Sequence, residues 1–256
     1  MLTTHWQQYL ASQRSRGAAG NHTTDLNAPV TQTILVDASY QGILAVTGID
    51  ALRFLQGQTT CDFQQINNAT SHLGACCTPK GRMFTNFRAV CIHDIFYLQM
   101  HSALVESTRI ALDKYIRFFK ATMSDATNDW IRIGISGPDA DTLLKNHIGT
   151  IPSTIDDVTP IDTSGITVRL PGSQPRFELW LNNLHAAQTC WETLSTHAQQ
   201  SEPSHWELLN IQAGIATLTP ETVDAFTPHM INYQSVNGIN LTKGCYTGQE
   251  RDRLLF

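Results

Sequence analysis

Short apolar runs separated by turn residues mark the first half of the chain. Five runs are rich in β-branched and other apolar residues and predict strands: residues 34–36, 43–46, 73–77, 83–90 and 95–100. Pro79 and Gly81 lie between the third and fourth runs. A proline presets one turn dihedral and a glycine accepts a positive one, so a tight hairpin is predicted there.

Helical spacing appears between these runs. One helix is predicted to follow Asp50, a good N-cap residue, and to end at Gly57. From Val105 to Phe119, apolar residues recur three and four positions apart, which predicts an amphipathic helix of about four turns. The second half repeats this style, with predicted strands at 130–136, 166–170 and 177–181, a helix start at 137–139, and helices through 190–196 and 207–213.

This order of elements fits an α+β fold made of two helix-and-antiparallel-sheet lobes. We expect a polar N-terminal segment at 1–33, a first lobe at 34–128 and a second lobe at 129–218. Residues 219–238 carry prolines, asparagines and little periodicity. We interpret them as an ordered loop that crosses between the lobes, within a last segment at 219–256.

Composition narrows the possible partners. The 256 residues include 17 basic and 22 acidic ones, for a formal net charge of −5, and no block of like charge stands out. Strong direct binding to nucleic acid is therefore not expected. No apolar stretch in the first 25 residues resembles a signal peptide or a membrane span, so we expect a soluble, cytoplasmic protein with no membrane partner.

The six cysteines are expected to be reduced thiols, because the chain is too large to need disulfides and lacks an export signal. There is no CxxC pair, no HExxH motif and no His/Cys grouping with zinc-like spacing. The sequence therefore predicts no metal-ligating residues, and it argues against an iron–sulfur cluster held by this chain alone.

Chemistry is concentrated in residues 243–250, with the sequence KGCYTGQE. Lys243, two positions before Cys245, can favour the thiolate form of that cysteine. Gly244 and Gly248 let the backbone approach a partner closely or adopt left-handed angles. The alternative is that the glycines only build a turn and that Cys245 is a small buried apolar residue, the commonest fate of a free cysteine.

The segment KGCYTGQE resembles the signature of the YgfZ family. Further blocks occur in the family's order: residues 54–58 (FLQGQ), 73–76 (LGAC) with 80–82 (KGR), 175–177 (PRF), 211–214 (IQAG) and 226–228 (FTP). The resemblance covers roughly residues 34 to 250. It implies a fold similar to the aminomethyltransferase of the glycine cleavage system, in which lobes surround a central folate pocket.

The resemblance also implies a function. Family members support the assembly or repair of iron–sulfur enzymes, including those that thiolate tRNA, so iron–sulfur assembly proteins or client proteins are the expected partners. By the family pattern Cys245 carries this role with Lys243. The expected cofactor is tetrahydrofolate or a derivative, and Gly244, Tyr246, Gln249 and Glu250 belong to the same site.

A folate site needs an apolar wall for the pterin ring and a cation for the anionic tail. Trp206 matches a folate-contacting tryptophan of the family. The second such tryptophan corresponds to Gln41, beside Tyr40, which could turn in to replace it. Arg82 and Arg176 are candidate tail anchors. The alternatives are a packed tryptophan and two solvated arginines.

Relatives continue past the signature into a small β-barrel domain, whereas six unmatched residues follow Glu250 here. We therefore expect that domain to be missing from this chain. A folate-binding accessory protein is the first hypothesis. A folate-dependent aminomethyl or one-carbon transferase is the alternative enzyme; its acid could be Asp224 or Glu221, and fold alone is weak support for it. A truncated, non-functional relative is the third.

Overall fold

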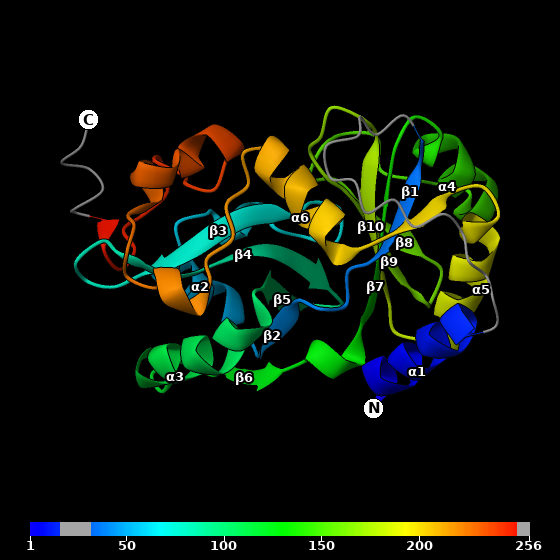
Figure 1. Ribbon diagram of the computed structural model, residues 1–256. Coiled ribbons are helices and arrows are strands. Elements are labelled where there is room, and N and C mark those ends of the chain that lie inside the picture. Colours follow the sequence, from blue (N-terminus) through cyan, green and yellow to red (C-terminus); the bar gives the residue numbers. More distant parts are fainter. Residues whose placement is uncertain (16–31, 250–256) are drawn as a thin grey trace. The chain divides into compact units, whose positions relative to one another are not determined.

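The computed structural model describes residues 1–15 and 32–249 of the chain (Figure 1). Helices and two β-sheets are present, which confirms the predicted α+β class. The chain divides into two compact units. Unit 1 comprises Met1–Tyr40 and Thr127–Ala213, and unit 2 comprises Gln41–Ala126 and Gly214–Phe256.

Within the described residues, unit 1 contains a six-stranded sheet with the order β11-β1-β7-β10-β9-β8. β1 pairs parallel with β11, and the other pairings are antiparallel. The strands are β1 (Ile34–Asp37), β7 (Ile131–Ser136), β8 (Val158–Ile161), β9 (Gly165–Arg169), β10 (Arg176–Leu181) and β11 (Gln199–Ser201).

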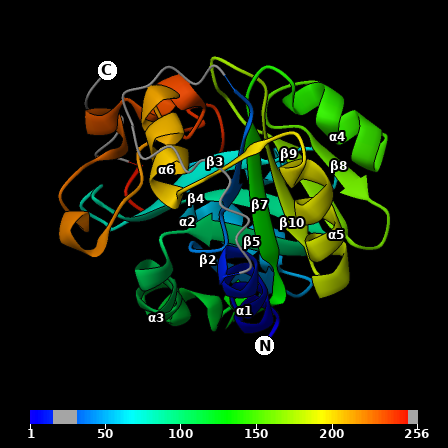
Figure 2. The ribbon, with the colours of Figure 1, turned by 45° about the vertical axis from the view of Figure 1, so that its right-hand side comes forward.

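One face of this sheet forms the core of unit 1. Because side chains alternate along a strand, Ile131, Ile133 and Ile135 point to the same face, where they join a buried apolar cluster. Helices pack on it, and Figures 1 and 2 show α4 and α5 on one side of β7 and β10. The helices of unit 1 are α1 (Leu2–Ser15), α4 (Ala140–Ile148), α5 (Leu184–Ser195) and α6 (Pro203–Gln212).

The described part of unit 2 contains an antiparallel five-stranded sheet with the order β3-β4-β5-β2-β6. Figure 1 shows α3 running alongside β6. Phe54 of α2 packs on Phe119, just after α3, with ring centroids 5.4 Å apart. The elements are β2 (Gly42–Thr47), β3 (His72–Cys77), β4 (Met83–Ile92), β5 (Ile95–Met100), β6 (Thr122–Asp125), α2 (Ala51–Gln58) and α3 (Val105–Ile116).

The predicted loop at 219–238 is ordered and packs on the sheet of unit 2. Three short 3-10 turns occur in it: Pro220–Thr222, Pro228–Ile231 and Tyr233–Val236. Tyr233 is fully buried, and its hydroxyl donates to the carbonyl of Gly74 on β3 at 3.2 Å. Gly238 lies against the Tyr233 ring, because a Cβ at that position would approach ring carbons to 2.3 Å.

The units differ from the sequence-based lobes at their boundaries. Residues 34–37 were expected in the first lobe, but β1 pairs with β7 and β11 of unit 1. The polar N-terminal segment contains helix α1, whose Trp6 is fully buried against Trp191, with ring centroids 5.6 Å apart. Across the described residues, no helix is long and apolar enough to pass through a membrane.

Candidate functional site

Cys245 differs from the other cysteines of the chain, all of which lie among the described residues. Its side chain is exposed, whereas Cys61, Cys76, Cys77, Cys91 and Cys190 are buried. Burial raises the pKa of Cys61 to about 11 and that of Cys190 to about 12, because a thiolate is poorly solvated in the protein interior. The alternative of a buried Cys245 is therefore wrong.

Lys243 is buried, and its ammonium group lies beside the C-terminal end of α2. Nζ donates to the carbonyl oxygens of Gln56 at 2.8 Å, Thr59 at 2.7 Å and Cys61 at 2.6 Å. Gln56 lies in the last turn of α2, where carbonyls lack helical partners and the helix dipole places partial negative charge. An ammonium group has three N–H donors, so none remains for the Cys245 sulfur. Burial lowers the pKa of Lys243 to about 8.

An asparagine shapes the chain just before Cys245. The side-chain oxygen of Asn240 accepts hydrogen bonds from the backbone N–H groups of Thr242 and Lys243, both at 2.9 Å. Such a turn is typical of asparagine. The backbone N–H of Asn240 in turn donates to the carbonyl of Thr60 at 2.9 Å. The segment before Cys245 is thereby fixed to the chain that follows α2.

The chain after Cys245 is fixed to the same region. The backbone N–H of Thr247 donates to the Gly57 carbonyl of α2 at 3.2 Å, and its hydroxyl to Oε1 of Gln58 at 3.2 Å. Tyr246 and Gln249 are both buried, and the Tyr246 backbone N–H donates to Oε1 of Gln249 at 3.3 Å. We define residues 240–249 as the signature loop. It presents Cys245 between two anchored segments.

The two glycines of the signature loop have different surroundings. Gly248 has φ +91°, and a Cβ there would lie 2.5 Å from the carbonyl oxygen of Thr78, so the fold itself requires a glycine. A Cβ at Gly244 would meet nothing within 4 Å, and its φ lies outside the left-handed region. Packing and backbone conformation therefore explain why residue 248 is a glycine, but not why residue 244 is one.

Trp206 and Arg176 contact each other in unit 1. The guanidinium carbon of Arg176 lies 4.0 Å from the centroid of the Trp206 ring, and Nη2 donates to the Trp206 carbonyl at 3.1 Å and to Oδ1 of Asn210 at 2.8 Å. A Cβ at Gly134 of β7 would lie 2.8 Å from the indole, so only a glycine admits the ring. Both side chains are 1% exposed, and each packs within unit 1.

The remaining predicted site residues do not join this pair. Tyr40 lines a cleft of about 670 Å³ in unit 1, together with Asp37 and Trp191. Gln41 is half-buried directly before β2, and the half-buried Arg82 donates to the carbonyl of Ala225. Glu250 lies outside the described residues.

Sequence reasoning missed several residues that build these sites. Asn240 carries a recognisable signal, since an Asx turn commonly involves asparagine, whereas Gly134 and Asn210 carry none. The contribution of Asn240 is therefore the one that could have been found in advance. No group of three or more His, Cys, Asp or Glu side chains suited to a metal ion is found among residues 1–15 and 32–249.

Comparison with known proteins places this fold in a class. The family model of the GCVT N-terminal domain matches residues 4–234. Among solved structures, the glycine cleavage system aminomethyltransferase T from Bartonella henselae superposes with a TM-score of 0.73 over 88% of this chain and 63% of that one, at 16% identity. The fold is thus that of the aminomethyltransferase.

Curated relatives narrow the class further. The tRNA-modifying protein YgfZ of Colwellia psychrerythraea (strain 34H) is 32% identical over 225 residues, which is 87% of this chain and 67% of the relative. The protein of the same name from Enterobacter sp. (strain 638) is 32% identical over 218 residues, which is 84% of this chain and 65% of the relative. The chain belongs to the YgfZ family of GCVT-domain proteins and spans about two thirds of the length of these relatives.

Proposed function

We propose that the chain is a folate-binding accessory protein that supports the assembly or repair of iron–sulfur enzymes, including those that thiolate tRNA. Membership of the YgfZ family supports this proposal, as do relatives named tRNA-modifying proteins. The observation that carries it is the exposure of Cys245 on a loop anchored at both ends, while every other cysteine is buried.

Cys245 would act as a transient ligand to an iron–sulfur cluster or as a redox-active thiol at a protein interface. To bind iron, the thiol loses its proton and the sulfur donates an electron pair to the metal. Clusters are held by several thiolates, usually four. Cys245 supplies one, so the donor or client protein supplies the others and takes the cluster when its own cysteine displaces Cys245.

Folate is the proposed cofactor, and the described residues fit it in part. Trp206, the ring contact implied by the family resemblance, has its ring packed by Arg176 and Gly134. Tyr40 supports the proposal better, because it lines a cleft of about 670 Å³, within the range of about 300–1,000 Å³ typical of small-molecule sites. We therefore propose Tyr40 as an aromatic contact for the pterin ring and derive no chemical step through the folate.

The role of Cys245 can be tested in cells that depend on this chain for tRNA thiolation. Cys245→Ala is expected to reduce the thiolated fraction of tRNA, while Cys91→Ala, which removes a buried thiol, leaves it unchanged at equal protein levels. Undiminished thiolation with Cys245→Ala would refute the proposal.

Folate binding is tested by calorimetric titration of the purified chain with tetrahydrofolate. We expect saturable binding that Tyr40→Ala weakens about tenfold, which corresponds to about 1.4 kcal/mol, a plausible contribution for a lost aromatic contact. If the wild-type chain gives no heat of binding, folate is not its cofactor, and the hypothesis of a non-functional relative is favoured. Equal affinity of Tyr40→Ala and wild type would remove Tyr40 from the site.

The alternative, a one-carbon transferase, needs an acidic group near the reactive folate nitrogen. Asp224 and Glu221 are both exposed, and a hydrogen bond from Thr219 lowers the pKa of Glu221, which keeps this carboxylate ionised. Turnover of tetrahydrofolate with a glycine-derived aminomethyl donor would favour the enzyme. Folate binding without turnover would favour the accessory protein.

A further inference from the structure

The outer side of α3 in unit 2 exposes several large apolar side chains. Phe118, just after the helix, is 85% exposed, Ile110 is 60% exposed, and Ile49, in the turn before α2, is 87% exposed. Ile110, Lys114 and Phe118 follow one another at four-residue spacing, so they lie on one side of the helix and its extension. We define these residues with Ile49 as the α3 face.

Two hydrogen bonds and one close backbone approach hold the turn before α2 against the segment after α3. The backbone N–H of Lys120 donates to Oδ2 of Asp50 at 2.9 Å, and the N–H of Asp50 donates to the Lys120 carbonyl at 3.3 Å. Gly48 lies against the same carbonyl, because a Cβ there would come within 2.3 Å of it. The turn that carries Ile49 is therefore tied to the segment that directly follows Phe118.

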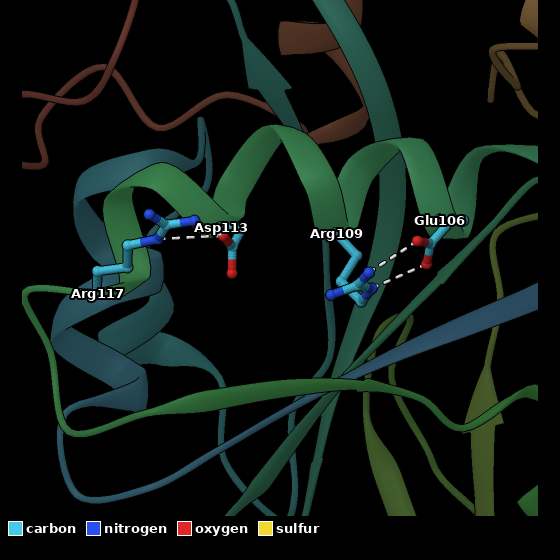
Figure 3. A network of polar contacts seen from close by, with 4 residues as sticks. All are labelled: Glu106, Arg109, Asp113 and Arg117. Carbon is cyan, nitrogen blue, oxygen red and sulfur yellow. Dashed lines mark hydrogen bonds and ion pairs between the residues drawn. The ribbon is translucent and has the colours of Figure 1, made fainter.

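The charges around the α3 face are predominantly positive. Figure 3 shows that the two carboxylates of α3 are held by arginines of the same helix: Glu106 pairs with Arg109 at 2.7 Å, and Asp113 pairs with Arg117. The charges that these pairs leave are those of Lys114, Lys120 and Arg53, against the carboxylate of Asp50, whose Oδ2 accepts from the Lys120 backbone N–H. Lys114 lies 4.8 Å from the centroid of the Tyr115 ring, and Arg53 lies 5.6 Å from that of Phe119.

We propose that the α3 face binds a partner protein whose surface has an apolar pocket rimmed by acidic side chains. Protein interfaces combine an apolar centre with a polar rim, and opposite charges across the rim favour association. The face offers both components: the exposed apolar side chains of Ile49 and Phe118, and the basic side chains of Lys114, Lys120 and Arg53 on the same or adjoining segments. The inference goes beyond the proposed function and does not depend on Cys245.

Other occupants fit the α3 face less well. A second copy in a two-fold dimer would bring the same lysines together, and like charges across an interface are costly. Nucleic acid is bound by several stacked aromatic side chains and cations; on this face Phe118 offers a π-face, whereas Ile49 and Ile110 do not. An anionic membrane would gain only about 1 kcal/mol for each basic residue, and few basic residues are present.

The proposal is tested by placing a photo-crosslinking amino acid at Phe118 in the full chain, in cells, with the same amino acid at Ile211 of unit 1 as the control. Ile211 is 70% exposed and lies on α6. We expect position 118 to crosslink to one protein, through a peptide rich in Asp and Glu. We expect no crosslink at position 211. Equal labelling at both positions, or a crosslink to RNA, to lipid or to a second copy of the chain, would overturn the proposal.

Purified components then test the charge complementarity. The identified protein is titrated against wild type and against the Lys114→Glu/Lys120→Glu variant, with Lys145→Glu of unit 1 as the control. We expect about tenfold weaker binding for the double variant only, and weaker binding of wild type as salt rises. Unchanged affinity of the double variant would contradict an acidic rim. Binding of purified tRNA or phosphatidylglycerol vesicles that Phe118→Ser abolishes would assign the face to those ligands instead.

Discussion

Units 1 and 2 each bury a cation beside a residue that the family resemblance assigns to the site, but with opposite results. In unit 1, Arg176 lies over Trp206 and bonds to its carbonyl, so both side chains pack within the unit. In unit 2, Lys243 bonds to three carbonyls near the end of α2 and leaves its neighbour Cys245 exposed.

The difference shows that a residue's place in a motif does not determine which way it faces. Lys243 was predicted to act on the cysteine, but its hydrogen bonds instead fix the loop that presents the cysteine. Trp206 was predicted to contact folate, but its described contacts are those of a core residue. In both cases the buried cation is a structural element. In unit 2 the thiol next to it is exposed and available for chemistry, whereas in unit 1 the indole next to it is buried.

The largest expected change in the free energy of unfolding comes from removing the Trp206 side chain. Trp206→Ala should lower the free energy of unfolding by about 3–5 kcal/mol, because it leaves a cavity beside a buried guanidinium. Ile211→Ala, on the exposed side of the same helix, is the control and should change it little. Urea unfolding followed by circular dichroism measures both. Equal losses would show that Trp206 is not a core residue.

Gly134 sharpens the same test. Gly134→Ala adds a methyl group 2.8 Å from the indole and should cost about 1–3 kcal/mol through overpacking. The cost should fall in the Trp206→Ala background, since the methyl then has room. Additive losses in the double variant would mean that the two residues do not touch.

The anchoring role of Lys243 is tested by Lys243→Met, which keeps the aliphatic stem and removes the ammonium group. We expect a loss of about 2–3 kcal/mol, because three buried carbonyls lose a charged donor. Lys80→Met, at an exposed hairpin turn of unit 2, is the control. All five tryptophans lie in unit 1, so circular dichroism should report the loss more strongly than tryptophan fluorescence. An unchanged unfolding curve would contradict the anchor.

The two glycines of the signature loop are expected to differ in their contribution to stability. Gly248→Ala should cost about 1–3 kcal/mol, because the residue has a left-handed φ and lies against Thr78. Gly244→Ala should leave stability within about 0.5 kcal/mol of wild type. Thermal unfolding of both variants gives the comparison. If Gly244→Ala destabilised as much as Gly248→Ala, the loop would pack more tightly than its geometry indicates.

Alkaline pH should weaken the fold through the buried thiols. The folded-state pKa values of Cys61, Cys76 and Cys190 are raised, so above about pH 9 the unfolded chain releases protons that the folded chain retains. Their stabilising contribution is complete below that pH and is lost as pH rises towards 11 and 12. The pKa of Lys243 is lowered to about 8, so from about pH 8 upward this group makes the fold more stable as pH rises. One lysine opposes three cysteines, and we expect the cysteines to dominate.

Urea unfolding in reductant at about pH 8 and about pH 10 measures the net effect. We expect lower stability at the higher pH and a smaller difference in Cys190→Ala. Stability that rises with pH would show that Lys243 dominates.

Most of the fold could be predicted because it follows local apolar patterns. β5 has the predicted bounds, and α3 begins at the predicted residue. The missed elements are more polar: β6 is mostly exposed, β8 contains Pro160, and α1 buries only Trp6 and Leu10. Pairing and packing partners stabilise these segments, so their own sequence carries little signal.

The candidate site was predictable in its location and not in its geometry. KGCYTGQE identifies the segment, but the acceptors of Lys243 lie 182 to 187 residues earlier in the chain. The exposure of Cys245 depends on those distant contacts, just as the burial of Trp206 on α6 depends on Gly134 of strand β7. Sequence spacing contains no information on either.

Cys245 is the accessible thiol of the folded chain. Titration of the native, reduced protein with a thiol-reactive dye tests it directly, with the unfolded protein as reference. We expect one rapidly reacting thiol in wild type, none in Cys245→Ala, and six in the unfolded wild-type chain. A rapid thiol that persists in Cys245→Ala would contradict it.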